Sequence, residues 1–304
     1  MRKTIISSVF VATVGLAATL ACNAATVLDD DELMPTGKGW GQRVPPGLAK
    51  QPGNGKPQGN NGIFYHGGPL ILGTTNAYYI WYGNWSGNTA MTILTDFASN
   101  IGGSPYFNIN TTYSDGSNAH VSGAVSYAGS TSDNYSRGTA LSDGDIQTVV
   151  ANAIQHGLPR DTNGVYFVLT SADVNETSGF CTQYCGWHTH GTIAGADIKY
   201  SFVGNPDRCP SACEAQSTGP NRNAGADGMA SIIAHELEEA VTDPDLNAWY
   251  DRRGAENGDK CAWTFGTTYT ANGAHANMRL GSRDYLIQQN WVNASGGYCA
   301  KSYP

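Results

Sequence analysis

The sequence predicts a single α+β domain that is built on a mixed sheet and stabilised by disulfides. Of the 304 residues, 38 are glycine and only 14% are charged, whereas average soluble domains contain about 7% glycine and about 25% charged residues. That composition excludes a coiled coil or a helical bundle. Stretches with strand and helix patterns alternate along residues 76–241, which favours one α+β domain. Seven cysteines are present, as in many exported proteins.

The N-terminus has the pattern of a signal peptide over residues 1–24. Arg2 and Lys3 precede an apolar run at 5–20, and small residues lead up to Ala25. The run is too short to cross a membrane comfortably, and we expect no membrane span elsewhere. The mature protein is therefore expected to be secreted or extracellular, with the periplasm as another possible location. Residues 25–62 contain five prolines and an acidic run, which predicts a disordered linker or a pro-segment. The globular domain is expected over 63–304.

Each element of the domain has a local signal. Aromatic and β-branched runs predict buried strands at 76–82 and 164–170. Apolar residues at helical spacing predict helices at 88–101, 142–157 and 227–241, the second capped by Ser142 with Asp145 three residues later. Asp227 is the expected N-cap of the third helix. Short alternating stretches predict antiparallel hairpins over 105–135, and the last sixty residues are expected to form strands and loops.

The cysteines predict disulfides rather than a zinc site. If Cys22 leaves with the signal peptide, six remain: Cys181, Cys185, Cys209, Cys213, Cys261 and Cys299. An even number in an oxidising compartment favours three disulfides. Two arrangements stay open. Either 181–185 and 209–213 pair locally, with 261–299 as the third bond, or the first two pairs are linked to each other.

The strongest chemical signal is the motif His235-Glu236-Leu237-Glu238-Glu239. On a helix, His235 and Glu239 lie one turn apart on the same face. This geometry parallels the H-E-x-x-H helix of zinc peptidases, in which two ligands hold the ion and the first glutamate is the general base. We therefore predict Zn²⁺ ligation by His235 and Glu239, and Glu236 as the catalytic base. A carboxylate at the second ligand position would tolerate Ca²⁺ better than a histidine would, so Ca²⁺ is an alternative or additional structural ion. Glu238 is expected to point outward.

Three further residues complete the predicted site. Asp259 and Glu256 follow His235 by about two dozen residues, a spacing at which zincins supply a third carboxylate ligand, and we expect Asp259 to take that role ahead of Glu256. Cys261 could hold this loop by a disulfide. His188, which follows the first cysteine pair, is expected to enter the site as a ligand or to stabilise the oxyanion of the transition state.

Taken together, these motifs resemble the phosphate-induced protein 1 / EXORDIUM family of exported proteins. The resemblance covers most of residues 76–299 and rests on YIWYG at 79–83, FC at 180–181, CGWH at 185–188, VGN at 203–205, CP at 209–210 with Cys213, DGM at 227–229, AHE at 234–236 with Glu239, NAWY at 247–250, Glu256 with Asp259 and Cys261, and YC at 298–299. It implies an extracellular protein. The family is linked in plants to growth signalling and cell-wall expansion but implies no particular reaction.

Two functions follow as expectations. The first is an exported zinc-dependent metallopeptidase with a zincin-like fold, which hydrolyses an extracellular protein or peptide. The alternative is a non-catalytic extracellular module that a metal stabilises and that binds cell-wall polysaccharide or a receptor. The net charge of −8 argues against nucleic-acid binding, because the phosphate backbone attracts positively charged proteins. The sequence leaves the oligomeric state open.

Overall fold

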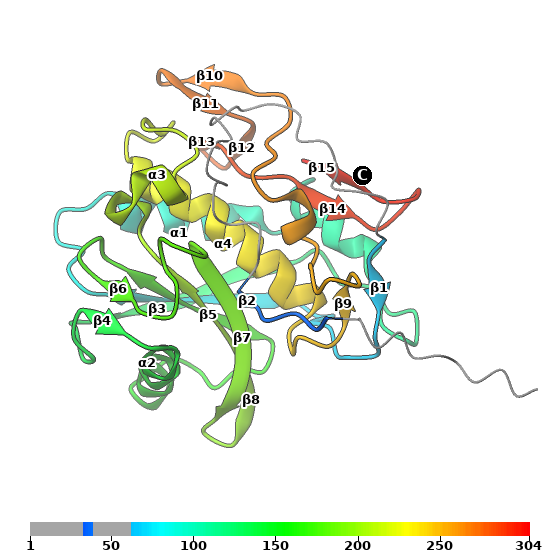
Figure 1. Ribbon diagram of the computed structural model, residues 1–304, viewed down its shortest axis with the longest axis horizontal. Coiled ribbons are helices and arrows are strands. Elements are labelled where there is room, and N and C mark those ends of the chain that lie inside the picture. The colour runs from blue at the N-terminus through cyan, green and yellow to red at the C-terminus, as the bar shows by residue number, and fades with distance from the viewer. Residues whose placement is uncertain (1–32, 39–61) are drawn as a thin grey trace, which may run out of the picture. The chain divides into compact units, whose positions relative to one another are not determined.

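The computed structural model describes residues 33–38 and 62–304 (Figure 1). The predicted signal peptide and most of the predicted linker lie outside the described residues. None of the helices in the described part has the length and apolarity that crossing a bilayer requires.

A five-stranded mixed sheet forms the centre of the fold, in the order β3-β2-β5-β8-β7. Its strands are β2 (Thr75–Tyr82), β3 (Val125–Asp133), β5 (Gly164–Thr170), β7 (Gly186–Ile193) and β8 (Ala196–Val203). The first four strands in the sheet order run parallel, and the edge strand β7 is antiparallel to β8. The helices and the mixed sheet confirm the predicted α+β class, whereas the zincin-like fold stays a prediction. The strands at 76–82 and 164–170 are confirmed.

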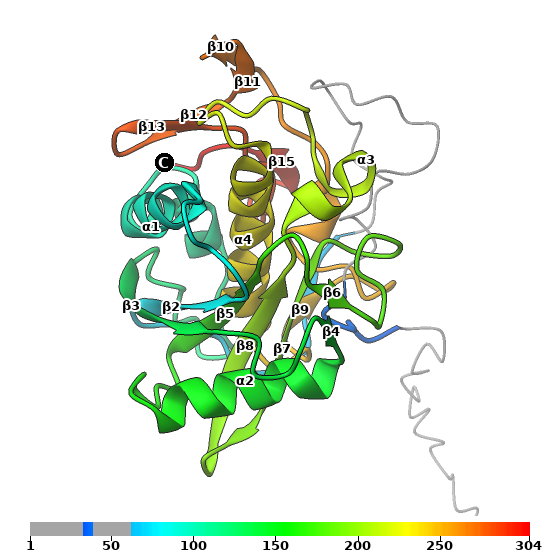
Figure 2. The same cartoon turned by 90° about the vertical axis from the view of Figure 1, so that its left-hand side faces the viewer.

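Helices cover both faces of this sheet. They are α1 (Ala90–Ile101), α2 (Asp143–Gln155), the short α3 (Pro210–Cys213) and α4 (Ala224–Thr242). Figure 2 shows α1 and α4 on one face and α2 on the other. Both faces of the central strands are thus covered, which explains why β2 and β5 are buried almost without interruption and are mostly apolar instead of alternating. Ser142 and Asp145 form the predicted capping box of α2.

Shorter elements complete the chain. The 3₁₀ turns are η1 (Phe107–Thr112), η2 (Pro206–Arg208) and η3 (Asp259–Cys261). The two-stranded pairs are β1 (Phe64–Tyr65) with β9 (Trp249–Tyr250), β4 (Ala140–Leu141) with β6 (Asn175–Glu176), β10 (Tyr269–Ala271) with β11 (Ala274–Ala276), β12 (Met278–Leu280) with β13 (Arg283–Tyr285), and β14 (Asn290–Val292) with β15 (Tyr298–Ala300). The C-terminal strands and loops were correctly predicted.

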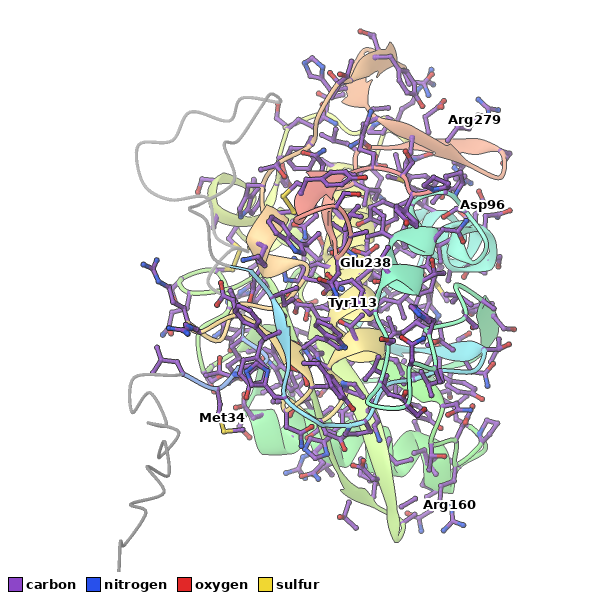
Figure 3. All side chains as sticks on the ribbon, turned by 90° about the vertical axis from the view of Figure 1, so that its right-hand side faces the viewer. Met34, Asp96, Tyr113, Arg160, Glu238 and Arg279 are labelled. Atoms are coloured by element: carbon purple, nitrogen blue, oxygen red, sulfur yellow. A yellow bond between two sulfur atoms is a disulfide. The ribbon has the colours of Figure 1, made fainter. Side chains whose placement is uncertain are left out.

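Helix α4 is enclosed on all sides. It packs on β7 and β8 with one side, while α1, η1 and the C-terminal segments cover the other (Figure 2). Met229, Ile233, Leu237 and Ala240 are buried, as predicted. The prediction that Glu238 points outward is wrong: its side chain lies in the interior (Figure 3) and accepts a hydrogen bond of 3.0 Å from the Tyr106 hydroxyl. A helix buried on every face has no outward side for a charge to reach.

Two other expectations need correction. Residues 105–135 do not form antiparallel hairpins; they contain η1 and then β3, which pairs in parallel with β2. The alternating pattern of this stretch reflects an edge strand, which is half exposed. The N-cap of α4 is Asn223, whose side chain accepts a hydrogen bond from the backbone N–H of Ala226, so Asp227 lies within the first turn.

Three disulfides join the six cysteines of the described chain: Cys181–Cys209, Cys185–Cys213 and Cys261–Cys299. The local pairing of 181 with 185 and of 209 with 213 is wrong, and the alternative in which the two pairs are cross-linked is confirmed. The first two bonds tie the start of β7 to the segment between β8 and α4. β7 carries His188, and α4 carries His235, Glu236 and Glu239. Three disulfides are consistent with an oxidising, extracellular location.

Candidate metal centre

The HExxE motif lies in the C-terminal half of α4, and two of its side chains meet as predicted. His235 Nε2 lies 2.9 Å from Glu239 Oε1, one turn later, and both side chains are 1% exposed. Asp259, in η3, brings its Oδ1 to within 3.5 Å of His235 Nε2. The backbone N–H of Asp259 also donates to Glu239 Oε1 at 3.1 Å. These three residues therefore form a compact group in which each offers one metal-ligating atom.

Close packing holds the loop that carries Asp259 against α4. Gly258 approaches the motif so closely that a Cβ atom there would lie 3.0 Å from Glu239 Oε1 and from His235 Cγ. The Asn257 side chain donates to the Glu238 carbonyl of α4 at 3.2 Å. The Cys261–Cys299 disulfide ends the loop, as predicted. Any larger side chain at 258 would displace the loop from the helix.

His188 and Glu256 form a second group beside the first. His188, on β7, places its Nε2 3.1 Å and 3.2 Å from the two carboxylate oxygens of Glu256. The same nitrogen lies 3.7 Å from Glu239 Oε2. Glu239 thus belongs to both groups, with one oxygen facing each histidine. The structure brings the five predicted ligands His188, His235, Glu239, Glu256 and Asp259 together.

The electrostatics of the cluster follow from its burial. Burial, and then the nearby Asp259, raise the pKa of Glu239 to about 7, although His235 opposes the shift. Burial and then the charges of Glu239 and other acids raise the pKa of Glu256 well above its usual range. Burial lowers the pKa of His188 to about 3, so its imidazole is neutral. For His235 burial opposes protonation, but Glu239 and Asp259 outweigh it and raise the pKa. The site concentrates negative charge that a cation would stabilise.

Several ligating atoms lack a hydrogen bond. Within the described residues, His235 Nε2, Glu239 Oε2 and Asp259 Oδ1 are buried and have no hydrogen-bond partner. Buried polar atoms are normally paired, because leaving one unpaired costs roughly 1–3 kcal/mol. Imidazole nitrogen and carboxylate oxygen are ligands that Zn²⁺ binds in proteins. The donor set therefore fits a zinc ion, and the two imidazoles suit calcium less well, because Ca²⁺ takes oxygen ligands.

Glu236 lies next to this cluster, on the side of α4 that packs against β7. Its side chain is fully buried, and a Cβ atom added at Gly186 of β7 would lie 3.2 Å from Glu236 Oε1. Its charge acts on both His235 and Glu256. Glu236 thus sits between the helix and the edge strand, close to both groups of ligands.

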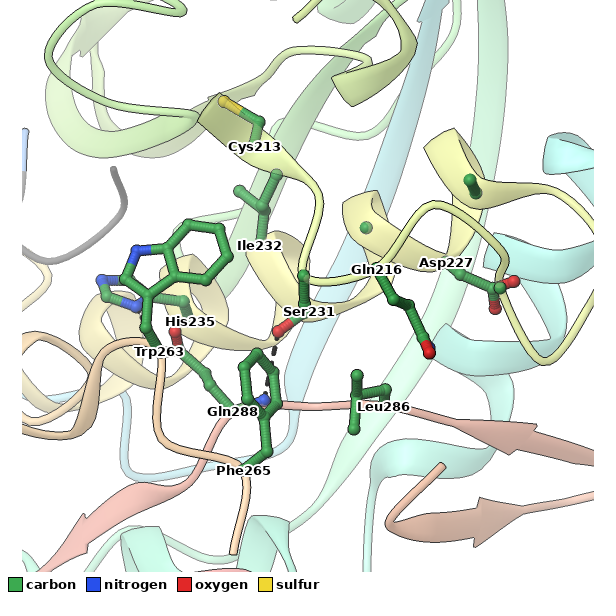
Figure 4. Close-up of a pocket in the computed structure, with 14 residues that line it drawn as sticks. Cys213, Gln216, Asp227, Ser231, Ile232, His235, Trp263, Phe265, Leu286 and Gln288 are labelled. Atoms are coloured by element: carbon green, nitrogen blue, oxygen red, sulfur yellow. Dashed lines mark hydrogen bonds between the residues drawn. The ribbon is translucent and has the colours of Figure 1, made fainter. Parts of the chain in front are cut away.

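Sequence reasoning missed Gln288 and the pocket that it borders. The Gln288 amide contacts His235 Nδ1, which leaves Nε2 as the nitrogen that faces the carboxylates. Such a contact orients a ligating imidazole. Trp263, Phe265 and Leu286 line an apolar pocket beside His235, and the Gln288 backbone N–H donates to Ser231 there (Figure 4). Gln288 carries no motif or spacing signal, so only the tertiary structure reveals it.

A third histidine–carboxylate group, nearer the surface, differs in kind. His190 Nδ1 lies 2.8 Å from Asp197 and 3.5 Å from Asp245. The Lys199 ammonium already contacts both carboxylates, at 2.5 Å and 3.3 Å. That lysine neutralises the group without a metal ion, so the buried cluster is the better candidate.

The comparisons with known proteins agree with the family resemblance of the sequence motifs. The family model described as the phosphate-induced protein 1 conserved region matches residues 63–283. Protein EXORDIUM-like 5 of Arabidopsis thaliana is 32% identical over 277 residues, which cover 75% of this chain and 74% of that protein. Protein EXORDIUM-like 3 of the same plant is 31% identical, with 77% and 81% covered. Protein PHOSPHATE-INDUCED 1 of Nicotiana tabacum is 28% identical, with 63% and 68% covered. No solved structure gives a significant match.

Proposed function

Because this chain belongs to the phosphate-induced protein 1 family, an extracellular plant family without an established reaction, we propose its function from the site itself: a zinc-dependent metallopeptidase. The observation that carries the proposal is the buried group of His235, Glu239 and Asp259, with Glu236 on the same helix. These three side chains would hold the ion. A zinc ion there would supply Lewis acidity and lower the pKa of a bound water toward neutrality.

Glu236 is the proposed catalytic base. It lies one residue after the first ligand and between α4 and β7, the position that a general base needs beside a zinc ligand. It would accept the proton of the attacking water and pass it to the leaving amine. The role of His188 in oxyanion stabilisation stays a prediction, since its Nε2 faces two carboxylates.

The outer edge of β7 is the proposed docking site for the substrate backbone. β7 ends the sheet, and an edge strand can pair with an extended peptide. The chain itself provides an example: the His188 backbone N–H donates to the Gly37 carbonyl at 3.0 Å. Lys38 fastens this segment, 33–38, by contacts of 2.6 Å to Asp143 and to Ser178. The neighbouring apolar pocket of Trp263, Phe265 and Leu286 would accept an apolar side chain of the substrate.

Displacing the 33–38 segment is expected to raise peptidase activity. Gly37 has φ +65°, and a Cβ atom there would lie 1.9 Å from the His188 carbonyl oxygen, so Gly37→Ala should detach the segment. We expect kcat/KM for a peptide substrate to rise about tenfold. This corresponds to about 1.4 kcal/mol, the free energy with which the segment competes with the substrate. Met34→Ala, in the same segment at a residue that is 62% exposed, is the control and should change little. Unchanged or lower activity in Gly37→Ala would contradict a competing role for the segment.

The proposal is tested by peptide hydrolysis with and without metal. The protein is freed of metal with a chelator, and cleavage of a mixed peptide library is followed by mass spectrometry before and after Zn²⁺ is restored. We expect cleavage only with the metal. Cleavage that is equally fast in the metal-free protein would refute the proposal, and so would intact peptides in the presence of fully loaded protein.

One observation favours a second function, a non-catalytic extracellular module that the metal stabilises. The residues His188, Glu236, Glu239 and Glu256 are all at most 1% exposed, as in structural metal sites, which are closed to solvent. Such a module would bind polysaccharide or a receptor through another surface. It predicts that chelation lowers stability while the loaded protein leaves every peptide intact.

A further inference from the structure

We propose that the cluster holds two metal ions rather than one, with Glu239 as the carboxylate that bridges them. The inference rests on the proposed metal site and adds a second ion position, formed by His188, Glu239 and Glu256. The first position is that of His235, Glu239 and Asp259. Paired metal ions about 3.5–4 Å apart are a recurring arrangement in hydrolases.

The geometry divides the ligands into two sets. In each set the ligating atoms lie within 4.8 Å of one another, and only Glu239 belongs to both. Its Oε1 lies 2.9 Å from His235 Nε2, while its Oε2 lies 3.7 Å from His188 Nε2. A carboxylate that directs its two oxygens at two different imidazoles is arranged as a bridging ligand.

A buried atom without a hydrogen bond points into the second position. Among the described residues, Glu239 Oε2 is buried and has no hydrogen-bond partner. The nearby His188 Nε2 lies 3.7 Å away, and the Glu239 side chain is 1% exposed. On the other side of His188 Nε2 both oxygens of Glu256 lie at 3.1 Å and 3.2 Å. The second set therefore offers one imidazole and two carboxylates, the same donor types as the first.

Charge balance also favours two ions. The carboxylate ligands Glu239, Glu256 and Asp259, together with the adjacent Glu236, carry four negative charges when ionised, and both histidines are neutral when they ligate a metal. One divalent ion leaves two buried negative charges, which are costly unless they are paired. Two divalent ions compensate all four carboxylates.

Metal counting tests this inference without any assay of activity. The full mature protein is freed of metal, saturated with Zn²⁺, passed through a desalting column and analysed by plasma mass spectrometry. We expect two ions per chain in the unaltered protein and one in Glu256→Gln, with two retained in the control Asp197→Asn, whose carboxylate belongs to the Lys199 group. One ion per chain in the unaltered protein, or the same number in Glu256→Gln, overturns the inference.

A second measurement avoids the risk that a variant fails to fold. Cobalt is substituted into the unaltered protein, and its electron paramagnetic resonance signal is recorded after one and after two equivalents. Magnetic coupling between two bridged ions should weaken the signal per cobalt at the second equivalent, whereas a signal that simply stops growing after one equivalent indicates a single ion. Two ions without hydrolysis would refute the peptidase alone, and one ion with chelator-sensitive hydrolysis would refute the second site alone.

Discussion

Glu236→Gln is expected to lower the kcat of peptide hydrolysis about 1,000-fold while the metal content stays unchanged. General base catalysis typically contributes about 10²–10⁴-fold, and the amide of glutamine cannot accept the proton. Glutamine has nearly the same shape as glutamate, so the fully buried position next to Gly186 remains filled. The measurement is kcat on a cleaved peptide, together with the zinc content and the thermal melting curve of the variant.

Glu238→Gln provides a matched control on the same helix. Glu238 is equally buried, but its carboxylate accepts a hydrogen bond from Tyr106 and belongs to neither group of ligands. Burial raises its pKa well above the usual range, even though the Tyr106 hydroxyl opposes the shift. This favours the neutral acid, which an amide replaces closely. We expect kcat to stay within about threefold, a change of less than about 1 kcal/mol. A similar loss in both variants would assign the effect to packing and not to catalysis.

The sequence predicted which polar side chains lie together better than it predicted the fold around them. His235 and Glu239 were predictable because helical spacing alone brings residues four apart together. Asp259 and Glu256 could be proposed from their distance along the chain, but the contact of Asp259 with His235 and that of Glu256 with His188 depend on the loop that Gly258 allows to approach α4. Nothing local encodes that approach.

The errors have more than one physical origin. Glu238 was assigned to the solvent because an amphipathic helix usually has one exposed face, and α4 has none. β7 and β8 were not predicted, since strands with polar residues such as His190 and Lys199 lack an apolar run. Gln288 became a contact of His235 only through the path of the C-terminal segment.

Removing the metal is expected to lower the melting temperature on the order of 10 °C at pH 8.5, and by less at pH 6.5. Zinc binding stabilises small structural sites by about 10–16 kcal/mol near pH 7. A third of that stabilisation is on the order of 5 kcal/mol. For a domain of this size each kcal/mol shifts the melting temperature by about 2–4 °C, which gives a shift of roughly 10–20 °C. The measurement is thermal unfolding followed by circular dichroism, with Zn²⁺ and with chelator, at both pH values.

The direction of the pH effect follows from the metal-free cluster. The folded-state pKa values of Glu239, about 7, and of Glu256 are raised above those of the unfolded chain, so the folded protein binds extra protons as the pH falls from 8.5 to 6.5. His235, with a raised pKa, does the same. Each such proton adds up to about 1.4 kcal/mol of stability per pH unit. His188, with a pKa lowered to about 3, is neutral in the folded state throughout this interval.

Metal binding has the opposite dependence, because the ligands must lose those protons before they bind. The metal-free protein should therefore become more stable as the pH falls to 6.5, while the stabilisation that Zn²⁺ adds becomes smaller. Asp197→Asn, in the group that Lys199 neutralises, should leave this difference unchanged. A gap between the two melting curves that widens toward pH 6.5, or curves that coincide at both pH values, would show that the buried carboxylates do not bind the ion.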